Sequence, residues 1–76
     1  MAREQVIEIV SEMVANVLGV SVETGARVEV GDEVALLESM KMEIPVLAET
    51  PGTVVAVKVA TGDVVQEGDV LLVMKA

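Results

Sequence analysis

The chain has 76 residues, a net charge of −8 and no cysteine, histidine or aromatic residue. It can therefore form neither disulfides nor a thiolate or imidazole metal site, and it lacks the usual general base for catalysis near neutral pH. The negative charge and the missing aromatic side chains argue against binding to nucleic acid or to an anionic membrane surface. No apolar segment reaches the roughly 20 residues that span a bilayer, and no signal peptide is recognisable, so we expect a cytoplasmic protein.

The opening segment, residues 3–18, is ambiguous in its periodicity. Apolar residues recur there at helical spacing, but Val6-Ile7-Glu8-Ile9-Val10 also has the β-branched composition of a strand. Valine provides 18 residues of the whole chain, which favours strands. The later valine-rich runs are short and are separated by turn pairs such as Gly31-Asp32 and Thr61-Gly62. This punctuation is typical of an all-β sandwich or barrel.

An internal repeat resolves the ambiguity. A shift of 37 residues lays the sequence on itself without a gap, which makes two copies, residues 3–39 and 40–76, of a single domain. The second copy carries Pro45 and Pro51 where the first is ambiguous. A proline inside a helix costs about 3 kcal/mol, so we expect strands in both copies.

Two equal copies predict a flattened β-barrel of two four-stranded antiparallel sheets related by a pseudo-twofold axis. The glycines of each copy are expected to form the turns after its second strand and before its fourth. Alternate residues of the second strand of each copy should point inward, namely Leu18, Val20, Val22, Val55, Val57 and Val59. The predicted strands are residues 5–11, 15–22, 27–29, 34–39, 42–48, 52–59, 64–66 and 70–75.

Lys41 differs from the other lysines by its position. Lys58 and Lys75 lie in predicted strands and are expected to be solvated charges, whereas Lys41 lies between two strands next to the junction of the copies. The pseudo-twofold axis places that junction at the end of the domain opposite the chain termini. Lysine is a nucleophilic amine once deprotonated, so a hairpin that presents it could serve as a covalent attachment point.

The residues around Lys41 allow more than one interpretation. Met40 and Met42 are either adaptable apolar fillers at strand ends or part of an exposed tip. Glu38 and Glu43 bracket the hairpin. A solvated acidic face is favoured over a glycosidase-type pair, because the chain has no aromatic sugar platform and no long loop.

Three motifs resemble the biotin carboxyl carrier family. Residues 38–43, Glu-Ser-Met-Lys-Met-Glu, are similar to its Glu-Ala-Met-Lys-Met motif, and Pro51-Gly52-Thr53-Val54 resembles its entry into the second half. The spacing Gly-Asp-x-Val-x-x-Gly-Asp at residues 62–69 also matches. The resemblance extends over residues 10–74 and is closest to the small stand-alone biotin/lipoyl attachment proteins.

The resemblance implies the barrel-sandwich hybrid fold and a function. Lys41 would be biotinylated by a biotin protein ligase that recognises the flanking Met40 and Met42. Glu38, Ser39 and Glu43 would form the rest of the hairpin around them. The attached biotin would carry a carboxyl group between a biotin carboxylase and a carboxyltransferase, and the domain itself would not be an enzyme. Because each chain is strongly acidic, two chains repel each other, and we expect a monomer in isolation.

The sequence departs from the family where Ser39 replaces alanine and where Glu12 and Ala15 replace the frequent proline and glycine. Two alternatives remain open at this point. One is a lipoyl carrier on the same lysine, although lipoyl domains resemble Asp-Lys-Ala at the hairpin and Met40 and Met42 argue against it. The other is a non-carrier acidic β module that binds a partner through an edge strand.

Overall fold

The structure is a computed structural model that describes residues 5–76. Residues 1–4, where the first copy of the repeat begins, lie outside the described part. Most strands coincide with runs rich in valine, leucine or isoleucine, and four of the six glycines lie between strands. The strands are β1 (Val6–Val10), β2 (Ala15–Val20), β3 (Arg27–Val28), β4 (Glu33–Ser39), β5 (Met42–Leu47), β6 (Gly52–Val57), β7 (Val64–Val65) and β8 (Val70–Lys75).

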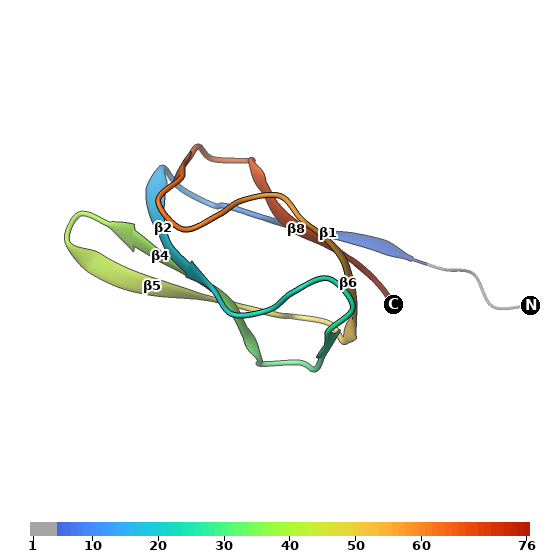
Figure 1. The fold of residues 1–76 in the computed structure, drawn as a ribbon. Coiled ribbons are helices and arrows are strands. Elements are labelled where there is room, and N and C mark those ends of the chain that lie inside the picture. Colours follow the sequence, from blue (N-terminus) through green and yellow to red (C-terminus); the bar gives the residue numbers. More distant parts are fainter. Residues whose placement is uncertain (1–4) are drawn as a thin grey trace, which may run out of the picture.

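The strands form two four-stranded sheets, in the orders β1-β8-β6-β3 and β5-β4-β2-β7, and every pairing is antiparallel (Figure 1). The predicted all-β fold is therefore confirmed. In the part of the chain that the structure describes, there is no helix with the length and apolarity to cross a membrane. The β4–β5 hairpin projects at one end, and β1 begins and β8 ends toward the other, which agrees with the prediction from the pseudo-twofold axis (Figure 1).

The repeat recurs in the hydrogen bonds of the main chain. The N–H of Ser11 donates to the carbonyl of Asp69 at 2.8 Å, and 37 residues away the N–H of Ala48 donates to the carbonyl of Asp32 at 2.9 Å. Each of these bonds joins one copy to the other. The same offset converts β1 into β5 and β8 into β4, so the two sheets exchange places under the pseudo-twofold operation. The copies are thus interlocked, with strands of each copy in both sheets.

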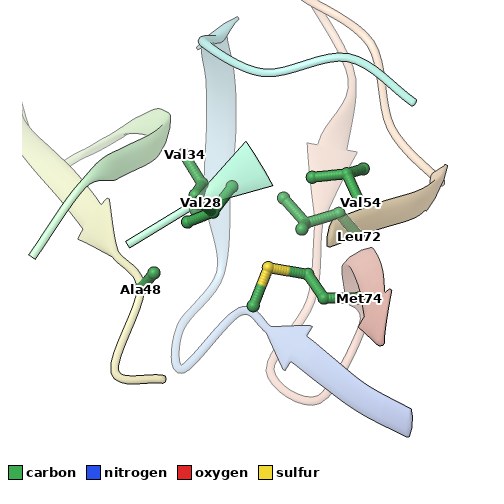
Figure 2. Close-up of a cluster of buried hydrophobic side chains, with 6 residues drawn as sticks. All are labelled: Val28, Val34, Ala48, Val54, Leu72 and Met74. Carbon is green, nitrogen blue, oxygen red and sulfur yellow. The ribbon is translucent and has the colours of Figure 1, made fainter. Parts of the chain in front are cut away.

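The core consists of two buried clusters that are also symmetry equivalents. Met74 in the first cluster corresponds to Leu37 in the second, and Val54 corresponds to Val17. Complete burial of such a side chain contributes about 1.5–3 kcal/mol. Figure 2 shows the first cluster, with members drawn from both sheets: Val28, Val34, Ala48, Val54, Leu72 and Met74.

The prediction that Leu18 and Val55 point inward was wrong. Their side chains are 36% and 38% exposed, whereas their neighbours Val17 and Val54 are buried. The reason is a bulge in each copy, between Val17 and Gly19 and between Val54 and Ala56, which inserts one residue into the alternation. Beyond the bulges the predicted faces hold, since the later inward residues are partly buried against the core: Val20, Val22, Val57 and Val59.

Strand ends differ slightly from the prediction. β2 and β6 end at Val20 and Val57, two residues before the predicted ends, so Lys58 follows β6 rather than lying in it. The turn prediction is confirmed, because the predicted turn glycines have φ angles between 90° and 97°, a region that favours glycine. These are Gly25, Gly31, Gly62 and Gly68.

Candidate functional site

The β4–β5 hairpin ends in a turn of only two residues. Ser39 pairs with Met42 across the strands, and Met40 and Lys41 close the turn with φ angles of 53° and 65°. Positive φ at both central positions is the signature of a type I′ turn, which usually contains Asn-Gly. A residue with a Cβ in this region costs about 1–2 kcal/mol. Within residues 5–76, Met40 and Lys41 are the only non-glycine residues with positive φ, so strain is concentrated at this tip.

The turn presents its side chains to solvent. Met40 is 91% exposed and Met42 is 65% exposed, and Lys41 is exposed between them. Of the two readings of the methionines, core filler is wrong and exposed tip is right. Among the described residues, the Lys41 side chain makes no hydrogen bond or ion pair. Its amine can therefore be covalently modified without breaking an interaction inside the domain.

Ser39 anchors the hairpin directly below its turn. Its hydroxyl donates a hydrogen bond of 3.1 Å to the carbonyl oxygen of Val14, in the connection between β1 and β2. The alanine that is usual in the motif could not make this bond. Sequence reasoning treated Ser39 as a small replacement for alanine and missed the contact, because the 25-residue separation gives no local signal.

Glu38 and Glu43 lie directly opposite each other on β4 and β5, one pair below Ser39 and Met42. Glu43 is exposed and Glu38 is partly buried. Like charges in opposite positions weaken a strand pair, so this acidic pair near the turn lowers the stability of the hairpin. No group of three or more acidic residues in the described range could hold a metal ion. Glu38 and Glu43 therefore form an acidic cross-strand pair below the Lys41 turn.

The other two lysines have different surroundings. Lys58 follows the end of β6, and Lys75 ends β8, where it pairs with Val6 of β1 and Thr53 of β6. Both are exposed, as predicted. Neither has a positive φ angle or a place in a two-residue hairpin turn. Backbone geometry therefore sets Lys41 apart among the lysines.

Comparison with known proteins gives a family and close relatives. The family described as "Biotin-requiring enzyme" matches residues 5–74. The chain is 54% identical over 61 residues to a biotin/lipoyl attachment protein of Bacillus subtilis, covering 80% of this chain and 84% of that protein. It is 51% identical over 64 residues to a biotinylated protein TB7.3 homolog of Mycobacterium leprae, covering 84% of this chain and 90% of the relative.

Similar solved structures are parts of much larger proteins. A single-chain, multi-domain long-chain acyl-CoA carboxylase superposes with a TM-score of 0.86 at 32% identity, over 91% of this chain. The urea carboxylase of Kluyveromyces lactis superposes with a TM-score of 0.85 at 30% identity, over 97% of this chain. The chain spans only 7% and 6% of these two proteins.

Proposed function

Because the chain belongs to the biotin/lipoyl attachment family, we propose that it is a biotin carboxyl carrier and that Lys41 is the residue to which biotin is attached. At the level of the family, it is a biotin-requiring carrier domain like those within acyl-CoA and urea carboxylases. The proposal adds the attachment residue, the cofactor and the partner enzymes.

The observation that carries the proposal is the position of Lys41 in a strained, exposed turn. Two residues are the shortest connection in common hairpins, so the tip that would be presented to a ligase is narrow. The turn keeps Met40 and Lys41 in a conformation that glycine and asparagine adopt more easily. Backbone strain retained at an exposed tip, where it stabilises nothing, supports a functional role for these side chains.

In this proposal the chain exposes the attachment amine at the hairpin tip and provides the first part of the flexible arm. Lys41 provides the amine for the amide bond, and its alkyl stem forms the first part of a mobile arm. The hairpin lies away from the start of β1 and the end of β8, so a connection to another domain there would not obstruct the arm (Figure 1). Attached biotin would supply the atom that carries a carboxyl group between a biotin carboxylase and a carboxyltransferase. With no histidine or cysteine in the sequence, the domain is suited to carrying rather than catalysing.

Met40 and Met42 support biotin over lipoate because Met-Lys-Met resembles the motif of biotin carriers, whereas lipoyl domains resemble Asp-Lys-Ala. Met40 and Met42 present apolar, adaptable side chains on both sides of the amine, which gives a ligase a recognisable surface. A biotinylated protein is also among the relatives, although the name of the Bacillus subtilis relative includes both cofactors. The net charge of −8 favours a monomer, because two copies of the chain repel each other.

The test is intact-mass spectrometry after incubation with biotin protein ligase, biotin and ATP. We expect the mass to rise by one biotinyl group in the native chain and in Lys58→Arg, and to stay unchanged in Lys41→Arg. Peptide mapping then locates the group on Lys41. A parallel incubation with lipoate and a lipoate ligase should leave the mass unchanged.

Each contrary outcome has a defined meaning. Biotinylation of Lys41→Arg would refute the assignment of the residue, and a lipoyl adduct without a biotinyl adduct would replace the cofactor. If neither ligase modifies the native chain and the protein carries no label in its own cell, the non-carrier interaction module becomes the better description.

A further inference from the structure

An apolar groove opens between the edge strands β1 and β5. Its volume is about 470 Å³. Ile7 and Ile9 of β1 form one wall and Ile44 and Val46 of β5 form the other. Leu37 and Met74, one from each buried cluster, also line it. We call this feature the twofold groove, because its lining residues form pairs that are 37 positions apart, such as Ile7 with Ile44 and Leu37 with Met74.

Both walls of the twofold groove are sheet edges. In the described residues, β1 pairs only with β8 and β5 pairs only with β4, so each strand has one row of main-chain groups outside any ladder. An extended peptide can pair with such an edge. Proline has no main-chain N–H, so within a sheet it lies on an edge strand with its nitrogen facing away from the neighbouring strand. Pro45 therefore removes one hydrogen-bond donor from the free edge of β5, which disfavours the addition of a strand there. β1 contains no proline and is the edge open to a further strand.

The rim of the groove is acidic. Glu8, Glu12 and Glu49 line it and are exposed, and no lysine or arginine is among the described lining residues. β1 and β5 run in opposite directions (Figure 1). Glu12 follows the end of β1 and Glu49 follows the end of β5, so the two glutamates belong to opposite ends of the groove. A second copy of this chain would bring a net charge of −8 against this rim, which disfavours self-association.

We propose that the twofold groove docks an extended segment of a partner protein in which apolar residues alternate with lysine or arginine. Alternate side chains of a strand point to opposite sides, so one set would enter the apolar groove while the other reaches the glutamates of the rim. The segment would pair with the free edge of β1. This docking site does not include Lys41, so the proposal stands independently of the attached cofactor.

The test uses a short fluorescent peptide of alternating valine and lysine, with a peptide of alternating valine and glutamate as its counterpart. Fluorescence anisotropy at low salt should give saturable binding for the first peptide and none for the second. The double variant Glu12→Lys/Glu49→Lys should weaken binding by about tenfold or more. The matched control, Glu23→Lys/Glu67→Lys, changes the net charge equally at exposed positions outside the groove and should leave the affinity nearly unchanged.

Methyl chemical shifts locate the binding site. The peptide should shift the methyl signals of Ile7, Ile9, Ile44 and Val46, and Lys41→Arg should behave like the native chain. Equal weakening by both double variants, or shifts spread over the whole surface, would reduce the effect to general charge attraction and overturn the proposal. Concentration-dependent shifts of the same methyls without peptide would identify a second copy as the occupant, which also overturns it. Absence of saturable binding has the same consequence.

Discussion

The Ser39 hydroxyl donates a hydrogen bond of 3.1 Å to the Val14 carbonyl, and this contact joins the Lys41 hairpin, directly below its turn, to the β1–β2 connection. It is a side-chain bond between the projecting hairpin and a segment 25 residues earlier in the same copy of the repeat. Two strands alone make a marginal unit in water, so a hairpin that extends beyond its neighbours gains rigidity from such an anchor.

Ser39→Ala should loosen the hairpin without changing the fold. A typical hydrogen bond contributes about 0.5–1.5 kcal/mol, and this one is solvent-exposed, so we expect a loss near the lower end of that range. Urea unfolding followed by circular dichroism measures the loss. Amide exchange should become faster in β4 and β5 near the tip and stay unchanged in β6 and β8. Uniformly faster exchange would show that the bond supports the whole domain rather than the hairpin.

Met40→Asn should stabilise the domain while impairing its modification. Met40 is 91% exposed, so its removal costs little packing, and asparagine adopts a φ angle of 53° more easily than methionine. Relief of this strain is expected to raise the free energy of unfolding by about 1 kcal/mol. The same change removes an apolar side chain next to Lys41, so the rate of biotinylation should fall.

The control is Met42→Asn, which alters the other flanking methionine at a position without positive φ. It should reduce the rate of biotinylation without the gain in stability, since asparagine is disfavoured in strands. If Met40→Asn left both the stability and the rate of modification unchanged, the turn strain would have no functional meaning.

The sequence predicted the features that depend on local chemistry and on the repeat. Glycines at 25 and 62 indicated their turns because positive φ favours glycine, and the prolines at 45 and 51 excluded a helix. The pseudo-twofold axis then placed Lys41 opposite the termini. This inference required no knowledge of individual contacts, only that equal copies pack symmetrically.

Other features depend on tertiary context and leave no trace in the pattern. The bulges at Val17 and Val54 turn Leu18 and Val55 outward, although all four residues are equally apolar. A type I′ turn is usually recognisable in a sequence by Asn-Gly. Here Met40 and Lys41 occupy the turn, although both residues disfavour positive φ angles. Such a conflict between sequence preference and structure is expected at a functional site.

Gly52→Ala should be strongly destabilising. A Cβ at this position would lie 2.8 Å from the carbonyl oxygen of Lys75 and 3.5 Å from the Cβ of Met74. Both are parts of β8, which pairs with β6, so the strands would have to separate to accommodate the methyl group. Overpacking of this kind costs about 1–3 kcal/mol, measurable as a lower midpoint of urea unfolding.

Gly19→Ala is the matched control for Gly52→Ala. It lies in β2, the methyl group of an alanine there would have open space for 4 Å around it, and the φ angle of Gly19 is not positive. The repeat already has alanine in the equivalent position, Ala56. We expect no loss, or a gain of about 0.4–1 kcal/mol from the reduced freedom of the unfolded chain. Equal destabilisation by both substitutions would contradict the close approach of β6 and β8 as the cause.

Asp69→Ala should destabilise the turn that links β7 to β8. The Asp69 carboxylate accepts a hydrogen bond of 2.8 Å from the N–H of Gln66, and its main-chain carbonyl accepts another of 2.8 Å from Ser11. Without the carboxylate the turn loses this hydrogen bond and becomes less rigid. The turn orients the main-chain carbonyl of Asp69 toward Ser11 in the other copy, so that contact should weaken as well. An exposed bond of this type is expected to contribute about 0.5–1.5 kcal/mol.

Removal of the negative charge of Asp69 should by itself raise the free energy of unfolding, which opposes the loss of the hydrogen bond. The chain has a net charge of −8, so deleting any acidic side chain relieves repulsion in the folded state and slightly raises stability. Glu67→Ala, at an exposed neighbouring position, measures that gain alone, and the difference in the free energy of unfolding between the two variants isolates the hydrogen bond. Asp69→Asn keeps an acceptor oxygen and should recover part of the loss. If Asp69→Ala were as stable as Glu67→Ala, the turn would hold its shape through Gly68 and the main chain alone.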